Sequence, residues 1–214
     1  MRSDAPRLTA DEAVARARLL ADAATPFRRV LLGVTGPPGA GKSTLAAAVA
    51  RALGPDVVAV VPMDGFHLAD GLLHALGRHD RKGAPDTFDA EGYADLLDRL
   101  RDRTRESFAP LFDRDRELAE VGAQRVAPGV PLVVTEGNYL LLADGPWRQV
   151  AGLLDECWYV DVDDEVRRRR LMARHEAHGR PAGEARARTL GSDEANALYV
   201  GRTRGAADAV VAPG

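Results

Sequence analysis

Residues 36–44 read Gly-Pro-Pro-Gly-Ala-Gly-Lys-Ser-Thr and fit the phosphate-binding loop (P-loop) pattern Gly-x-x-x-x-Gly-Lys-Ser/Thr. Glycines let such a loop bend so that successive backbone N–H groups point at phosphate oxygens, and the following helix adds its positive N-terminal end. Lys42 supplies a mobile cation for the β- and γ-phosphates, and Ser43 offers a hydroxyl to Mg²⁺. The pattern therefore predicts nucleotide binding by Gly36, Gly39, Ala40, Gly41, Lys42, Ser43 and Thr44.

The sequence on either side of the loop has the character that a P-loop requires. Residues 29–35 form a nearly continuous apolar run, which is typical of a strand buried on both faces. A helix is predicted from Gly41 to about Leu53. A chance match in a chain of 214 residues has a probability well under about one per cent. The loop and its flanks together predict a phosphate site.

Alternating strands and helices set the rest of the fold. Further strands are predicted over residues 57–61, 130–135, 157–162 and 209–211, and further helices over about 10–24, 90–103 and 164–177. Strands that alternate with helices indicate a parallel sheet covered on both faces. We expect an α/β fold, a three-layer α/β/α arrangement around a five-stranded parallel sheet, the P-loop containing nucleoside triphosphate hydrolase fold. A single domain over residues 1–214 is predicted, with a small helical lid at about residues 168–185.

The composition narrows the classes of function. With 29 Lys and Arg against 32 Asp and Glu, the net charge is −3, which gives no reason to expect nucleic-acid or membrane binding. No segment reaches the roughly 18 apolar residues of a membrane span, so we expect a cytoplasmic protein. Cys157 is the only cysteine, which excludes an intrachain disulfide, and its apolar neighbours predict a buried core thiol.

Two carboxylates stand where a ligand of a parallel sheet would be bound. Asp64 follows the strand predicted over residues 57–61, and Glu136 follows the one over 130–135. Ligands bind off the carboxyl ends of parallel strands, so both should converge with Ser43 beyond the P-loop. One carboxylate there can accept the proton of an attacking hydroxyl, and Ser43, Asp64 and Glu136 are candidate Mg²⁺ ligands. Each acid taken alone could equally be a strand-end cap or a surface charge.

Four further blocks follow the P-loop in order: residues 63–68 (Met-Asp-Gly-Phe-His-Leu), 81–89 (Arg-Lys-Gly-Ala-Pro-Asp-Thr-Phe-Asp), 110–114 (Pro-Leu-Phe-Asp-Arg) and 136–141 (Glu-Gly-Asn-Tyr-Leu-Leu). In this order the chain resembles a superfamily of P-loop kinases that contains uridine kinases, bacterial type I pantothenate kinases and phosphoribulokinases. It is most similar to the bacterial branch of nucleoside/nucleotide kinase-like, or fructose-transport-system kinase-like, proteins. The resemblance covers roughly residues 30–211.

The resemblance implies roles that the residues alone do not fix. It implies a general base at Asp64 and a Mg²⁺-linked carboxylate at Glu136. Beside these two acids, the implied substrate contacts are His67, Arg81, Lys82, Asp86 and Arg114. From the residues alone, His67 could equally be a hydrogen-bonded loop histidine, Arg81 and Lys82 a solvated pair, and Arg114 a partner of a neighbouring aspartate.

Four consecutive arginines, residues 167–170, lie on the helix after the fourth predicted strand. Helical spacing places Arg167, Arg170 and Arg174 on one face and sends Arg168 and Arg169 elsewhere, toward solvent. In the resembling superfamily the matching helix leads into a lid that closes over the triphosphate, which implies catalytic roles for Arg170 and Arg174, with Arg167 as the substitute. Further along, residues 193 and 196 are implied to lie by the nucleotide, although a simple helix N-cap at Ser192 explains that segment equally well.

The predicted function is that of an ATP-dependent kinase that transfers the γ-phosphoryl group to a hydroxyl of a small metabolite, such as a nucleoside, a sugar or a pantothenate-like compound. ATP and Mg²⁺ are the expected cofactors, and whether the chain forms a homodimer stays open. One alternative is a GTPase-type switch or other regulatory NTPase, but the sequence lacks an Asn-Lys-x-Asp guanine-reading motif. Another is a nucleoside-monophosphate kinase, which the adjacent cations Arg81 and Lys82 keep open.

Overall fold

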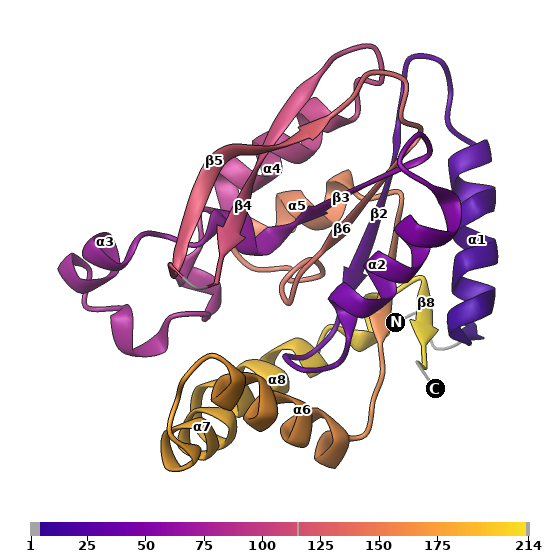
Figure 1. Ribbon diagram of the computed structural model, residues 1–214. Coiled ribbons are helices and arrows are strands. Elements are labelled where there is room, and N and C mark those ends of the chain that lie inside the picture. The colour runs from indigo at the N-terminus through magenta and orange to yellow at the C-terminus, as the bar shows by residue number, and fades with distance from the viewer. Residues whose placement is uncertain (1–4, 115, 213–214) are drawn as a thin grey trace.

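The computed structural model describes residues 5–114 and 116–212. A central parallel sheet runs in the order β1-β8-β7-β2-β6-β3 (Figure 1). Its strands are β1 (Arg7–Leu8), β2 (Val30–Thr35), β3 (Val58–Pro62), β6 (Leu132–Glu136), β7 (Glu156–Val160) and β8 (Ala209–Val211). The five expected strands are all present, and the two-residue strand β1 adds a sixth at one edge, where it pairs with β8.

Strand β2 lies inside the sheet because its sequence can be buried on both faces. All six of its residues are buried, and β6 and β7 flank it. Gly33 permits the close approach to β7, since a Cβ there would lie 2.8 Å from the Cys157 sulfur. Cys157 is a buried free thiol, as predicted, and burial raises its pKa well above the usual value.

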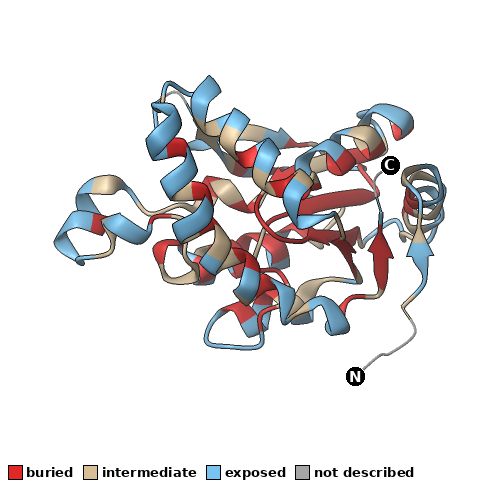
Figure 2. Cartoon of the chain, turned by 90° about the horizontal axis from the view of Figure 1, so that it is seen from below, coloured by how far each residue is buried: buried red, intermediate tan, exposed pale blue. Residues whose placement is uncertain are grey.

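Helices cover both faces of the sheet and bury separate apolar clusters against it (Figures 1 and 2). On one face, α1 (Ala10–Asp22) and α2 (Lys42–Leu53) pack on Leu32 and Val34 of β2. On the other, α4 (Ala90–Leu100) and α5 (Trp147–Leu153) pack around Leu31. Neighbouring residues of β2 thus point to opposite layers, which is the expected three-layer α/β/α arrangement.

An antiparallel hairpin extends beyond the sheet and was not predicted from the sequence. It consists of β4 (Ser107–Asp113) and β5 (Leu118–Val126), and it contacts the turn η1 (Met63–Phe66) and α4. Its alternation is obscured because Pro110 interrupts β4, where the register shifts, and because most of β5 is exposed.

Helices form both the segment predicted as a lid and the segment after β3. We keep the name lid for the first of these segments. The lid contains α6 (Asp164–Ala177) and α7 (Ala182–Arg188), and a π-helical turn (Thr189–Asp193) leads straight into α8 (Glu194–Gly201). Because these elements are continuous, Ser192 caps no helix, and that interpretation was wrong. The remaining short helices are α3 (Asp70–Ala75), η2 (His79–Arg81), η3 (Pro85–Thr87) and η5 (Arg204–Ala206). Among the described helices, none has the length and apolar character needed to cross a membrane.

Candidate active site

The P-loop joins β2 to α2, and its glycines are required by both conformation and space. Gly36, Gly39 and Gly41 have φ angles of 147°, 81° and 100°, which L-residues with a side chain rarely adopt. A Cβ on Gly36 would lie 2.8 Å from the carbonyl oxygen of Val160, and one on Gly39 would lie 2.8 Å from that of Arg167. The loop is therefore pressed against both β7 and the lid helix α6.

Lys42 is the first residue of α2, and its side chain is buried. Its ammonium donates to the carbonyl oxygens of Gly36 and Pro37 at 2.9 and 3.1 Å and to Oδ1 of Asn138 at 2.7 Å. Burial lowers the pKa of Lys42 to about 8, although the charges of Glu136 and Asp64 act in the opposite direction. The loop thus holds a cation at its centre in a desolvated setting.

The two strand-end carboxylates meet beside the P-loop. Pro62 of β3 pairs with Glu136 of β6, so Asp64, two residues further on, lies close to Glu136. The Ser43 hydroxyl donates to Oε1 of Glu136 at 2.8 Å. Burial, and next the charge of Asp64, raise the pKa of the Glu136 carboxyl above its usual value. Two carboxylates and a hydroxyl therefore present oxygen atoms to one space.

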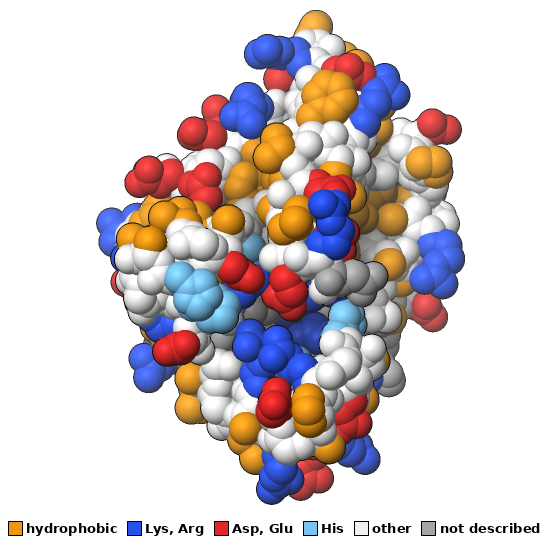
Figure 3. Space-filling view, turned by 60° about the vertical axis from the view of Figure 1, so that its left-hand side comes forward, with side chains coloured by type: hydrophobic (Ala, Val, Ile, Leu, Met, Phe, Trp, Pro, Cys, Tyr) orange, Lys and Arg blue, Asp and Glu red, His pale blue; other side chains and the backbone are white. Residues whose placement is uncertain are grey.

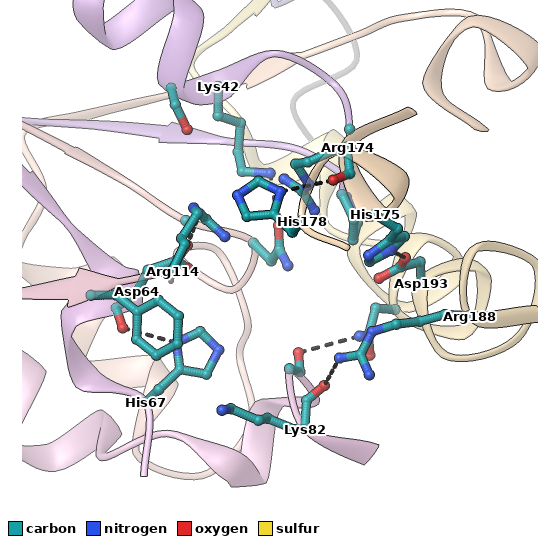
Figure 4. Close-up of a pocket in the computed structure, with 18 of the residues that line it drawn as sticks. Lys42, Asp64, His67, Lys82, Arg114, Arg174, His175, His178, Arg188 and Asp193 are labelled. Carbon is teal, nitrogen blue, oxygen red and sulfur yellow. Dashed lines mark hydrogen bonds and ion pairs between the residues drawn. The ribbon is translucent and has the colours of Figure 1, made fainter. Parts of the chain in front are cut away.

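These side chains line a cleft that is hollowed into the surface between the sheet and the lid (Figure 3). Its empty volume, counted with its open mouth, is about 1040 Å³. Lys42, Ser43, Asp64 and Glu136 all contribute to its lining. In Figure 4, Lys42 and the lid residue Arg174 lie at one end of the cleft, and Asp64 lies across the space from them.

Three of the five acceptor contacts implied by the resemblance line the cleft, and two do not. His67, Lys82 and Arg114 are lining residues. Arg81 and Asp86 instead form an exposed ion pair with each other, at 2.5 Å, and the structure does not bring them into the lining of the cleft. Arg81 is the last residue of the turn η2, and its side chain points outward. The side chain of Lys82, the next residue, points inward and is buried.

His67 and Arg114 are both held by Asp64. Nη2 of Arg114 contacts Oδ2 of Asp64 at 2.6 Å. Nδ1 of His67 lies 2.8 Å from the backbone oxygen of Asp64, which can only accept, so Nδ1 carries the proton and Nε2 has a lone pair. The ring contacts Phe88 and Phe112 at centroid distances of 4.1 and 4.6 Å, and burial lowers the pKa of His67.

The arginines of α6 lie in different surroundings, and helical spacing predicted only some of them. Arg174 lines the cleft, and Nη1 of Arg170 lies 3.6 Å from the position of a Cβ on Gly41. Arg167 is instead completely buried, where it binds Glu194 at 2.6 Å. Arg168, expected in solvent, also binds Glu194 at 2.6 Å. Arg167 is therefore a structural cation, and the expectation for Arg168 was wrong.

Other lining residues carried little or no signal in the sequence. His175 contacts Asp193 at 2.7 Å, and the pair joins α6 to the π-helical turn within the lid. Asn138, two residues after Glu136, could have been found from its place at a strand end. Glu117 and Arg188 could not, because only the fold brings a hairpin tip and a lid helix to this cleft.

Comparison with known proteins agrees with this geometry. A family model described as an AAA domain matches residues 31–192. The chain belongs to this family. A Schizosaccharomyces pombe protein provisionally named a uridine kinase is 38% identical over 187 residues, which are 81% of this chain and 78% of that protein. An Aspergillus versicolor protein named as ATP-dependent kinase-like is 39% identical over 152 residues, which are 66% of this chain and 88% of that protein.

A solved structure is similar to this chain over nearly its whole length. It is the crystal structure of a Silicibacter protein, provisionally described as a fructose transport system kinase, with a TM-score of 0.81 and 38% identity. The match covers 94% of this chain and 98% of that one. The expected superfamily and fold are confirmed. The chain is a P-loop kinase, a phosphotransferase that uses ATP and has a hydroxyl as its acceptor.

Proposed function

We propose that the chain transfers the γ-phosphoryl group of ATP to a hydroxyl of a small molecule bound in the cleft between Asp64 and the P-loop. One observation carries this proposal: a carboxylate from the end of β3 lines the same cleft as Lys42 and Ser43. The acceptor oxygen attacks the γ-phosphorus, the bond from that phosphorus to the bridging oxygen of ADP breaks, and the hydroxyl proton passes to Asp64.

Asp64 has support for its role as the base. Arg114 holds Oδ2 of Asp64 at 2.6 Å, which orients the carboxylate. The position of η1 is also fixed, because η1 packs tightly against the hairpin. A Cβ on Gly65 would lie 2.4 Å from the backbone oxygen of Pro110. A base in a fixed position is what proton transfer from a bound hydroxyl needs.

The residues near Ser43 suit Mg²⁺. A hard divalent cation takes oxygen ligands, and Ser43 with Glu136 would hold it, directly or through water, with Asp64 beside them. The described residues contain no group of three or more His, Cys, Asp or Glu that could hold a metal ion alone. That fits a cation bound together with nucleotide phosphates. When bound, Mg²⁺ neutralises charge on the β- and γ-phosphates.

Cations from the P-loop and from the lid support the transfer. Lys42 is placed for the phosphates by its position at the start of α2, and Arg174 lies near enough for its charge to lower the pKa of Lys42. We infer that Arg174, with Arg170, stabilises negative charge on the transferred group while the lid excludes water.

The test is ATP consumption with and without candidate acceptors. For the parent we expect slow hydrolysis alone and faster turnover with an acceptor. Asp64→Asn should lower acceptor-dependent turnover by about 10²–10⁴-fold and leave ATP affinity nearly unchanged, because general base catalysis contributes about that much. Asp56→Asn, an exposed change outside the cleft, is the matched control. Equal turnover in parent and Asp64→Asn would exclude this base, and a preference for GTP without acceptor dependence would favour a regulatory NTPase.

A further inference from the structure

The tip of the β4–β5 hairpin, residues 114–117, reaches the cleft with two side chains that are bound to different segments. Arg114, directly after β4, contacts the carboxylate of Asp64 at 2.6 Å. Glu117, directly before β5, contacts the ammonium of Lys82 at 2.7 Å. Because so short a connection allows little separate movement, the position of Glu117 constrains that of Arg114.

Lys82 is a buried cation, and among the residues that the structure describes only Glu117 accepts hydrogen bonds from it. Its ammonium donates to Oε2 of Glu117 at 2.7 Å and to the backbone oxygen of the same residue at 3.3 Å. Oδ1 of Asp70 lies 2.8 Å from the ammonium, but it accepts no hydrogen bond from any described residue. Burial acts to raise the pKa of the Glu117 carboxyl, yet the hydrogen bond and the charge of Lys82 lower it below its usual value. A buried charge that loses its hydrogen-bonded partner is strongly destabilised, so Lys82 holds Glu117 in place.

The backbone of Glu117 adopts a conformation that this contact explains. Among the described residues other than glycine, Glu117 alone has a positive φ, 53°. A side chain makes this conformation unfavourable, and residues that adopt it cluster at functional sites. Here the conformation directs both the backbone oxygen and the carboxylate of Glu117 to the same ammonium. The contact with Lys82 therefore offsets the cost of the strained backbone.

The loop that carries Lys82 is itself held from the core and from the lid. The hydroxyl of the buried Tyr139, three residues after β6, donates to the backbone oxygen of Gly83. Asn196 donates to the same oxygen at 3.2 Å, and Arg188 donates to the backbone oxygen of Lys82 at 3.1 Å. The hairpin tip is thus bound to a loop that is fixed at several points.

We propose that Glu117 is a positioning residue for the base, because its contact with Lys82 fixes the hairpin tip. Arg114 on the same tip then keeps the Asp64 carboxylate aimed at the acceptor hydroxyl. The proposal rests on the function proposed above, in which Asp64 is the base. A displacement of about 1 Å in a reacting group can lower a rate about 10²-fold, so a loosened tip should slow the transfer. Through this path Glu117 affects the rate without touching ATP or the acceptor.

Glu117→Ala tests the proposal because it removes the carboxylate that binds Lys82. The acceptor probes are uridine, pantothenate and D-fructose, and steady-state ATP consumption gives kcat and KM. With any probe that stimulates the parent, kcat should fall about tenfold, whereas KM for ATP should change less than about twofold because the P-loop is intact. Glu117→Gln should keep most of the rate, since its amide oxygen can still accept from Lys82.

Glu120→Ala is the matched control, because Glu120 lies on the same hairpin in an exposed ion pair with Arg116. It should keep the kcat and KM values of the parent. A kcat within about twofold of the parent in a folded Glu117→Ala protein would overturn the proposal.

A double-mutant cycle tests whether the effect passes through Arg114. Arg114→Ala should itself lower kcat about tenfold, and adding Glu117→Ala to it should lower kcat by less than about twofold more, because the two residues act through the same carboxylate. If Glu117 contacted the acceptor directly, the two losses would multiply. Losses that multiply would contradict a positioning role.

Amide hydrogen exchange in residues 107–126 needs no acceptor and measures how firmly the hairpin is held. Exchange at the tip should be at least about threefold faster in Glu117→Ala and unchanged in Glu120→Ala. Parent-like exchange in Glu117→Ala would mean that Lys82 does not fix the tip. Failure of the proposed function would look different: no probe stimulates the parent, or Asp64→Asn consumes ATP as fast as the parent does, although the tip still loosens in Glu117→Ala.

Discussion

The P-loop faces a second side of the cleft, the acceptor wall, which is formed by Asp64, His67, Lys82, Phe112, Arg114 and Glu117. The two sides are built in different ways. The P-loop comes from one run of residues, 36–43, and its shape is set by glycine φ angles and backbone contacts. The acceptor wall comes from η1 and the residue after it, the loop at Lys82 and the β4–β5 hairpin, and its charged side chains are paired. A site made from the backbone fixes what it binds, whereas a site made from side-chain pairs can change its ligand through one substitution.

The comparison is tested most severely at Lys42, the cationic side chain of the P-loop. Lys42→Ala should lower turnover by about 10³-fold, roughly 4 kcal/mol, because it removes the cation nearest the phosphates. ATP affinity should fall as well, which separates this variant from Asp64→Asn. The measurements are steady-state turnover and binding of a non-hydrolysable ATP analogue. Parent-like affinity and rate in Lys42→Ala would mean that the loop does not bind the triphosphate.

A glycine of the same loop tests whether backbone shape matters as much as charge. Gly39→Ala should lower the free energy of unfolding by about 1–3 kcal/mol, because Ala at φ 81° is strained and its Cβ would lie 2.8 Å from the backbone oxygen of Arg167. Gly152→Ala is the matched control, since it lies in α5 with nothing within 4 Å of its Cβ, and it should stabilise the protein slightly. Chemical denaturation measures both variants, and equal stabilities would remove the steric argument.

The same contrast explains how much of the molecule could be predicted from its sequence. The P-loop, Asp64 and Glu136 were located because each lies at the carboxyl end of a predicted strand, and parallel strands end together. Neighbouring basic residues were harder to separate. Arg81 faces outward and Lys82 inward because of contacts to Asp86 and Glu117, and these partners lie 5 and 35 residues away in the chain.

The lid and the hairpin mark the limit of such predictions. Helical spacing placed Arg174 correctly, but it could not show that Glu194 would hold both Arg167 and Arg168, because Glu194 belongs to α8. Glu117 had no signal at all, since it is a single acid in an exposed hairpin whose strands do not alternate cleanly. Residues that depend on contacts between distant elements need the fold before they can be assigned.

The pH dependence of ATP use separates the P-loop cation from the arginines of the cleft. The pKa of Lys42 is lowered to about 8, whereas an arginine stays charged far above that value. The charged form binds phosphate, so kcat/KM for ATP should fall as pH rises through about 8, by up to about tenfold per unit. The effect on folding has the opposite sign. The unfolded chain binds more protons between about 8 and 10.5, so this group adds stability as pH rises there.

Lys42→Arg serves as the reference for that profile. An arginine in its place should shift the alkaline limb upward, whatever its effect on the maximal rate. The measurement is kcat/KM for ATP from pH 6 to 10 in both proteins at constant ionic strength. A limb that stays at the same pH in Lys42→Arg would assign the titration to another group.

The smallest effect concerns the contacts between the lid helices and the backbone of the loop that carries Lys82. Nη2 of Arg188 donates to the Lys82 carbonyl oxygen at 3.1 Å (Figure 4). Nδ2 of Asn196 donates to the carbonyl oxygen of Gly83 at 3.2 Å. These bonds join α7 and α8 to the loop that carries Lys82. Lid closure over the nucleotide should therefore be coupled to the position of the acceptor wall.

Arg188→Gln should weaken this coupling by about 1 kcal/mol, the net value of one typical intramolecular hydrogen bond, with ATP affinity almost unchanged. Because a loosened lid admits water, the ratio of ATP hydrolysed to acceptor phosphorylated should rise a few-fold. Arg186→Gln, an exposed change on the same helix, should leave the ratio at the parent value. If both variants match the parent, the lid and the acceptor wall act independently, and the two sides of the cleft are joined only by their ligands.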